Sequence, residues 1–363
     1  GEEINSTKKR YIELNADANN ELKIASIYTT KISKEKQLRE WWSGLTLEWK
    51  KVFKKKLGLV YDSLSKDELF NLATIDSLDL KGNDLILDLE PIYQLTSLKH
   101  LKISNTWVND LKPLLSINKL QSLDVSNTSV FDLQYLKYHK DIRKLNLSNS
   151  HVEDFSVLTG FGKLTELNLN GIAGTDLSFL EGLNALEILS LEDAKGIDEV
   201  SFGQIKSLRS LHLKNSDIST VQGIAAMSQL SLLDLSATEI TSLAGFENLK
   251  SLQTLRIDNT EISDLTPLLG LTQLKMVYAN GAALTDEAID KFNSASRALL
   301  ITNSDQLMAW WNELPSPLKN KLGDVMGTFS PEVEDLSALV RLDSLDASQS
   351  GLKSLSPLTR FQS

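Results

Sequence analysis

Apolar residues recur along most of this chain with a period of 22 residues. From Leu95 to Leu114 they fall at positions 1, 4, 7, 9, 14, 17 and 20, and the same spacing returns in each following stretch. A stretch of 23 residues from Leu72 precedes the series. A period of this length is typical of a solenoid, in which each coil buries its apolar face against its neighbours. The position-1 residues are Leu95, Ile117, His139, Phe161, Leu183, Ile205, Met227, Leu249 and Leu271.

Positions 7 and 9 alternate with polar residues, which predicts one half-buried strand per coil. Because the strands of successive coils run in the same direction, we expect them to pair as a parallel sheet. Leu299 and Ile301 occupy positions 7 and 9 once more, after a helical pattern from Asp286 to about Ser296. The array over 72–304 is therefore expected to carry about eleven strands. They should line the concave face of a curved right-handed superhelix.

Three polar columns accompany the apolar ones. From Gly82 to Gly281 position 11 is Gly, Asn or Asp, with Ala237 as the exception. This composition predicts left-handed backbone at position 11, and the alanine should be strained there. Position 12 is mostly Thr or Ser, as at Thr106, and its hydroxyl is expected to bond backbone groups of adjacent coils. Position 16 is often Asp, which suits the N-cap of a short turn better than a calcium site, because oxygen ligands from several directions are lacking. These residues are Asp110, Asp132, Asp154, Asp176, Asp198, Asp264 and Asp286.

A helical module occurs twice, at 37–58 and at 306–327, with a pair of tryptophans at corresponding places. We expect each pair to clamp a helix onto the end of a coil stack, and a ligand cage is the alternative interpretation. A repeat opening follows each copy, at Leu72 and at Leu339. Upstream, Leu22 to Ile24 predicts a short strand, and 2–10 shows no regular pattern. The paired tryptophans are Trp41, Trp42, Trp310 and Trp311.

Four parts are therefore expected. They are an N-terminal helical cap at 1–71, the repeat array at 72–304, a second helical module at 305–335 and the start of a second array at 336–363. Phe361 stands at position 1 of a further coil. Since a last coil without a cap exposes its apolar face, we expect the second array to continue beyond the sequence given.

Composition restricts the chemistry. The chain has no cysteine, and its 48 acidic and 38 basic residues leave a net charge of −10, which disfavours nucleic acid as a ligand. Five lysines between Lys50 and Lys56 are read as the wet face of an amphipathic helix. His100, His139, His151 and His212 lack metal-site spacing, and His139 is expected to be a half-buried structural residue. Neither nucleotide-binding nor nucleophile motifs nor paired catalytic carboxylates occur, and no apolar run is long enough to insert into a membrane. We therefore expect a protein that is not an enzyme and uses no cofactor or metal.

The outward-facing strand positions 6, 8 and 10 form the candidate binding surface. In the later coils several of them are apolar or aromatic, for which folding provides no reason. Aromatic and arginine side chains are also the usual anchors of interfaces. The second helical module could cover part of this surface instead. The expected partner contacts are Ile188, His212, Leu232, Asp234, Arg256, Met276 and Tyr278, together with Lys102 and Trp107 from earlier coils.

The 22-residue period, the L-x-x-L-x-x-L-x-L core and the D-L-x-P-L turns together resemble the leucine-rich repeat family, in its bacterial internalin-like class. The resemblance covers 72–304 and part of 336–363. It implies an α/β solenoid with helical capping modules. Proteins of this class are typically secreted or attached to the bacterial surface and bind other proteins, so the resemblance implies an extracellular protein-binding module. The Trp-Trp module departs from the internalin cap, and host invasion is therefore not implied.

Two alternatives stay open. One is a cytosolic regulatory scaffold, because proteins that regulate phosphatases use a similar 22-residue repeat. A signal sequence upstream of Gly1 would favour the extracellular interpretation over this one. A glycan-binding surface protein is the other, although only Tyr278 offers an aromatic platform on the strands.

Overall fold

The computed structural model describes residues 8–16, 22–31, 33–174, 176–197, 202 and 205–342. The chain divides into two compact units, one of residues 1–142 with 150–152 and the other of residues 143–149 with 153–363. The first unit holds the hairpin, the first helical module and strands β3 to β5, and the second holds β6 to β13 and the later helices.

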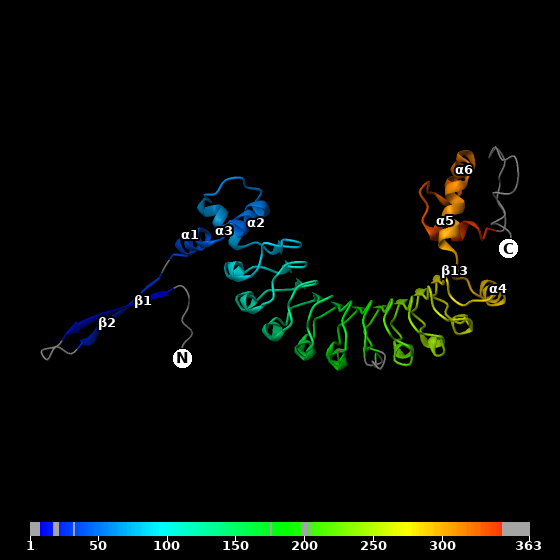
Figure 1. Cartoon of the computed structure of the whole chain (residues 1–363), viewed down its shortest axis with the longest axis horizontal. Helices are drawn as coiled ribbons and strands as arrows, with labels where there is room; N and C mark the ends of the chain where they lie inside the picture. The colour runs from blue at the N-terminus through cyan, green and yellow to red at the C-terminus, as the bar shows by residue number, and fades with distance from the viewer. Residues whose placement is uncertain are drawn as a thin grey trace. The chain divides into compact units, whose positions relative to one another are not determined.

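One strand and one short turn repeat coil by coil, as Figure 1 shows. The strands pair in chain order from β3 to β13 in an 11-stranded sheet, and the described pairs are parallel. Within the described residues this confirms the predicted strand number and direction. The strands are β3 (Ser77–Asp79), β4 (His100–Lys102), β5 (Ser122–Asp124), β6 (Lys144–Asn146), β7 (Glu166–Asn168), β8 (Ile188–Ser190), β9 (Ser210–His212), β10 (Leu232–Asp234), β11 (Thr254–Arg256), β12 (Met276–Tyr278) and β13 (Leu299–Ile301).

The last strand lies one residue out of the predicted frame. Leu300, not Leu299, pairs with Val277 at position 7. Leu299 and Ile301 are therefore register partners of Met276 and Tyr278. The coil that leads to β13 contains the α-helix α4 (Asp286–Ala295) instead of a short 3-10 turn, and it is one residue longer than 22. The sequence frame was wrong at this coil because it assumed equal lengths for both kinds of turn.

The polar columns hold the turns. All ten position-11 residues have positive φ, from 51° at Asn149 to 71° at Gly171, and Ala237 has 54°. The predicted left-handed column is confirmed, including its strained member. At position 12 the Oγ1 of Thr106 donates to the carbonyl of Ile103 at 2.7 Å, and Thr128, Ser216, Thr238 and Thr260 do the same. The expected bond to an adjacent coil is wrong, because the left-handed residue folds position 12 back onto position 9 of its own coil.

The position-16 aspartates brace the turns on the opposite side of each coil. Asp110 Oδ1 accepts the N–H of Lys112 at 2.8 Å, and Asp132, Asp154, Asp176 and Asp264 accept equivalent bonds. Asp286 departs from the column, since Thr285 caps α4, and Asp198 lies outside the described residues. The short 3-10 helices are η1 (Glu90–Gln94), η2 (Lys112–Ser116), η3 (Gln134–Tyr138), η4 (Ser156–Gly160), η5 (Ser178–Gly182), η7 (Ile224–Ala226), η8 (Phe246–Asn248) and η9 (Thr266–Leu268).

The N-terminal part is more regular than expected. β1 (Lys8–Ala16) and β2 (Leu22–Lys31) form an antiparallel pair, where only 22–24 had been predicted as strand. The first helical module follows as α1 (Lys34–Gly44), α2 (Leu47–Leu57) and α3 (Lys66–Ala73). Trp41 and Trp42 are buried, and their Nε1 atoms donate to the carbonyls of Pro91 and Asp62, each at 2.9 Å. Trp41 also packs against Phe53, 5.3 Å between ring centroids.

The second module repeats this arrangement in α5 (Ser304–Glu313), α6 (Ser316–Met326) and α7 (Val333–Leu339). Trp311 is buried in a cluster of leucines, and Trp310 packs half-buried against the same cluster. Both tryptophan pairs therefore serve as core contacts of their own helical modules. The bond from Trp41 to Pro91 of η1 fits the predicted clamp onto a coil stack, whereas the cluster around Trp311 consists of residues of the second module itself, so for the second pair the clamp stays a prediction. Leu72 and Leu339 are buried in the last turns of α3 and α7. Leu72 opens the first coil in the predicted frame, because Leu78, six residues later, is the buried residue of β3. The expected second array beyond residue 342 lies outside the described residues.

His139 departs from its prediction as well. It occupies an apolar position and is only 4% exposed, so it is buried rather than half-buried. Neither ring nitrogen has a hydrogen-bond partner, and burial lowers the pKa of the imidazole. A buried imidazole without a partner is held neutral by the cost of desolvating its charged form.

Candidate protein-binding surface

The outward side of the second unit's sheet carries most of the predicted contacts. Ile188 on β8 is 39% exposed, while Leu232 on β10 and Met276 on β12 are half-buried. Their strands bring them into one row, because equivalent positions of successive coils are register partners. In this row the apolar residues alternate with Ser210 and Thr254, and the most exposed apolar member is Ile188.

Tyr278 does not offer its ring to a partner, contrary to the expectation for this residue. It is 5% exposed, and its hydroxyl donates to the carboxylate of Glu334 on α7 and lies 3.6 Å from the sulfur of Met276. Burial and the Glu334 carboxylate raise the pKa of Tyr278 to about 12. The second helical module thus covers this end of the row, an arrangement that contacts between α7 and β13 also support.

Arg256 is held in place by its neighbours. Its guanidinium lies 4.0 Å from the centroid of the Tyr278 ring, a cation–π contact, and 3.9 Å from a carboxylate oxygen of Asp258. The residue stays partly open to solvent. Tyr278 therefore supports an arginine that can contact a partner, and it does not act as an anchor itself.

The polar residues between these strands differ in availability. His212 Nε2 lies 2.9 Å from Ser210 Oγ, and its Nδ1 lies 3.9 Å from Glu192 Oε1, with the ring partly exposed. Asp234 is only 7% exposed, and its Oδ1 accepts the N–H of Ser236 at 2.9 Å. Asp234 therefore braces its own turn, whereas His212 remains accessible.

Lys102 and Trp107 belong to the first unit. Lys102 is exposed on β4, and 64% of Trp107 is exposed in the turn that follows. The nine predicted contacts therefore fall into two sets, one in each unit. Lys102 shares position 8 with members of the second set, so the repeat position gave no signal for this division, whereas Trp107 stands at position 13, outside the strand.

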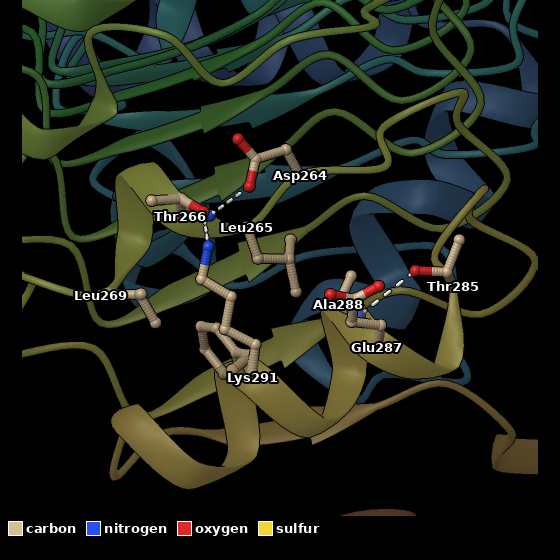
Figure 2. Close-up of a pocket in the computed structure, with 9 residues that line it drawn as sticks. Asp264, Leu265, Thr266, Leu269, Thr285, Glu287, Ala288 and Lys291 are labelled. Carbon is tan, nitrogen blue, oxygen red and sulfur yellow. Dashed lines mark hydrogen bonds between the residues drawn. The ribbon is translucent and has the colours of Figure 1, made fainter.

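A small hollow of about 170 Å³ lies between η9 and α4. Figure 2 shows Lys291 reaching from α4 to Thr266, whose Oγ1 accepts from Nζ at 3.0 Å. Asp264 Oδ1 accepts the backbone N–H of Thr266, and hydrogen bonds from Thr266 hold the pKa of this carboxyl below its usual value. The polar groups of this hollow already bond one another, so it joins two elements and provides no site.

The described residues contain no group of three or more His, Asp or Glu side chains placed to hold a metal ion. Over the same residues, no helix combines the length and apolar character that crossing a bilayer requires.

No protein-family model matches this sequence, and none of the curated proteins does. Solved structures match its fold. An internalin of Listeria monocytogenes, InlF, has a TM-score of 0.62 and 23% identity over 70% of this chain and 74% of its own. The functional domain of InlJ from the same organism has a TM-score of 0.54 and 18% identity over 73% of this chain and 60% of its own.

A complex of TLR13 with a single-stranded RNA, ssRNA13, has a TM-score of 0.51 and 23% identity over 59% of this chain and 33% of its own. At these identities the likeness concerns the fold alone. With its parallel strands, 3-10 turns and helical cap, this chain is a leucine-rich repeat solenoid that is structurally similar to the Listeria internalins.

Proposed function

We propose that this chain is a non-enzymatic protein-binding module that holds a partner against the sheet of its second unit, through Ile188, His212, Leu232 and Arg256. The observation that carries the proposal is Ile188, an apolar side chain 39% exposed at an outward-facing strand position. The internalin-like fold supports a binding role.

The surface is organised before a partner arrives. Arg256 is fixed by the Tyr278 ring and by Asp258, and His212 is fixed by Ser210. Side chains that are already ordered lose little rotamer freedom on binding, so more of the contact energy remains as affinity. Arginine next to an apolar residue is a frequent combination in the energetic centre of an interface.

A secreted or surface-attached bacterial protein is the cellular setting that we infer, on the strength of the similarity to internalins alone. The RNA in the TLR13 complex is a less suitable ligand for this chain, because a net charge of −10 opposes a phosphate backbone.

The test is affinity capture with the intact chain, followed by titration of the captured protein. Ile188→Asp combined with Arg256→Glu should weaken that binding by at least about tenfold, since it removes an apolar contact and reverses a charge. Val325→Asp is the matched control, because Val325 is 51% exposed in the same unit but lies on α6. The melting midpoint of both variants should stay close to that of the parent. Unchanged affinity in the double variant would reject this location, as would an equal loss in the control.

A further inference from the structure

We propose that a cavity in the first unit, between α2 and strands β3 and β4, binds an acidic peptide segment of a partner protein. The cavity measures about 1040 Å³. Its walls come from α2, from the whole of β3, from β4 and from the turns that follow the two strands, at Gly82 and Asn105. The proposal goes beyond the sheet surface of the second unit and does not depend on it.

The walls are strongly basic. Lys55 and Lys56 face the cavity from α2, Lys81 follows β3, and Lys102 lies on β4. Asp79 is the single carboxylate among the lining residues, and its Oδ1 accepts the backbone N–H of Lys81 at 2.9 Å. Four lysines and one aspartate therefore line the cavity, which leaves an excess of positive charge in a chain that is acidic as a whole. Of the four amines, Lys56 Nζ donates to Ser77 Oγ at 2.9 Å, a neutral partner that leaves its charge uncompensated.

The lining lysines differ from two other lysines of α2, Lys51 and Lys54. On α2, Lys51 pairs with Glu48 at 2.9 Å, and Lys54 pairs with Asp62 at 2.6 Å. Among the residues that the structure describes, neither Lys55 nor any of the other three lining amines lies within 4.0 Å of a carboxylate. Like charges gathered without a counter-charge raise the local potential and attract an anion.

The shape favours a peptide over a nucleic acid. β3 is the terminal strand of the sheet, so one of its edges faces the cavity side without a neighbouring strand of that sheet. An extended peptide can bond to such an edge through its backbone. Val52 contributes a half-buried apolar side chain to the lining. A long polyanion would also extend onto the acidic remainder of the chain, where it is repelled.

The experiment measures binding of a fluorescent peptide that alternates Glu and Leu to the full chain, by anisotropy. A Gln–Leu peptide of equal length tests the charge, and a single-stranded RNA of equal charge tests the ligand class. The Glu–Leu peptide should bind more tightly than both, and its binding should disappear near 1 M salt, where the Debye length falls to about 3 Å. Equal binding of the Gln–Leu peptide, or tighter binding of the RNA, would overturn the proposal.

Charge reversal locates the site. Lys81→Glu with Lys102→Glu should weaken binding of the Glu–Leu peptide by about tenfold or more, because two attractive contacts become repulsive. Lys51→Glu with Lys66→Glu is the matched control, since these exposed lysines carry the same charge but pair outside the cavity. The control should change the affinity by less than about twofold. Equal losses in the two variants would show that only net charge matters and would overturn the assignment, as would full affinity in the first. The neutral double variant Lys81→Gln with Lys102→Gln should show an intermediate loss of affinity for the Glu–Leu peptide. This variant keeps the test valid if the charge-reversed variant fails to fold.

Discussion

Replacing His139 by leucine is expected to stabilise the protein. The histidine occupies a position that other coils of the same unit fill with Leu95 and Ile117, which are 0% and 1% exposed. Its two ring nitrogens are buried without a partner. Leaving a buried polar group unsatisfied costs about 1–3 kcal/mol. His139→Leu has a similar volume and removes this cost, so the free energy of unfolding should rise by about 1–3 kcal/mol at pH 7.5.

The gain should grow in acid. Burial lowers the pKa of folded His139, whereas the unfolded imidazole has a pKa of about 6.5. The unfolded state therefore binds the proton more readily, and the parent loses stability as the pH falls from about 6.5 towards the folded pKa. One proton of difference contributes up to about 1.4 kcal/mol per pH unit. The advantage of the variant should therefore widen by up to about 1.4 kcal/mol between pH 7.5 and pH 5.5.

Urea unfolding followed by tryptophan fluorescence at both pH values provides the measurement. His100→Leu serves as the control, because His100 is an exposed histidine of the same unit and its loss should bring no such gain. The reasoning is refuted if His139→Leu is less stable than the parent at pH 7.5. It is equally refuted if variant and parent lose the same stability on going to pH 5.5.

Three further changes test other parts of the fold. Ala237→Gly should raise the free energy of unfolding by about 1 kcal/mol, because φ is 54° at this alanine and left-handed backbone costs an L-residue about 1–2 kcal/mol. An unchanged urea midpoint would contradict this. Tyr278→Phe removes the hydrogen bond to Glu334 and should lower the free energy of local opening of α7 by about 1–2 kcal/mol. Amide exchange in α7 should then be faster, and unchanged exchange would show that the bond contributes nothing. Trp41→Ala should lower the free energy of unfolding by about 3–5 kcal/mol, measured by thermal unfolding, because the Trp41 side chain is only 5% exposed. Trp310→Ala should lower it clearly less, because Trp310 is half-buried, and equal losses would contradict this difference in packing.

The repeat pattern predicted the features that depend on one coil and its neighbours. Strand direction and the left-handed column followed from a period of 22 residues and from the residue types at position 11. Even Ala237 adopts φ of 54°, because the coils on either side impose their turn on it. In a stack of equivalent coils, local sterics and nearest-neighbour packing point to the same backbone, so the sequence is sufficient.

The binding residues were harder to predict for a physical reason. Whether Tyr278 faces solvent or supports Arg256 depends on α7, which lies 56 residues further along the chain at Glu334. The basic cavity likewise combines α2 with β3 and β4. The sequence showed Lys55 and Lys56 only as one face of a helix, and it showed Lys102 only as a separate strand residue.

The sequence by itself determined the period, the parallel strands and the turn chemistry, because these arise from contacts within a coil or between adjacent coils. Tertiary structure alone decided the register of β13, the burial of Tyr278 and the placing of Lys55 and Lys102 around one cavity. The register of β13 depends on the length of the coil that contains α4, and the other two depend on a helix lying beside strands from another part of the sequence. No periodic pattern encodes either effect. Exposure of a residue in a repeat is set by its position in the coil, but its availability to a partner is set by what else folds over that coil.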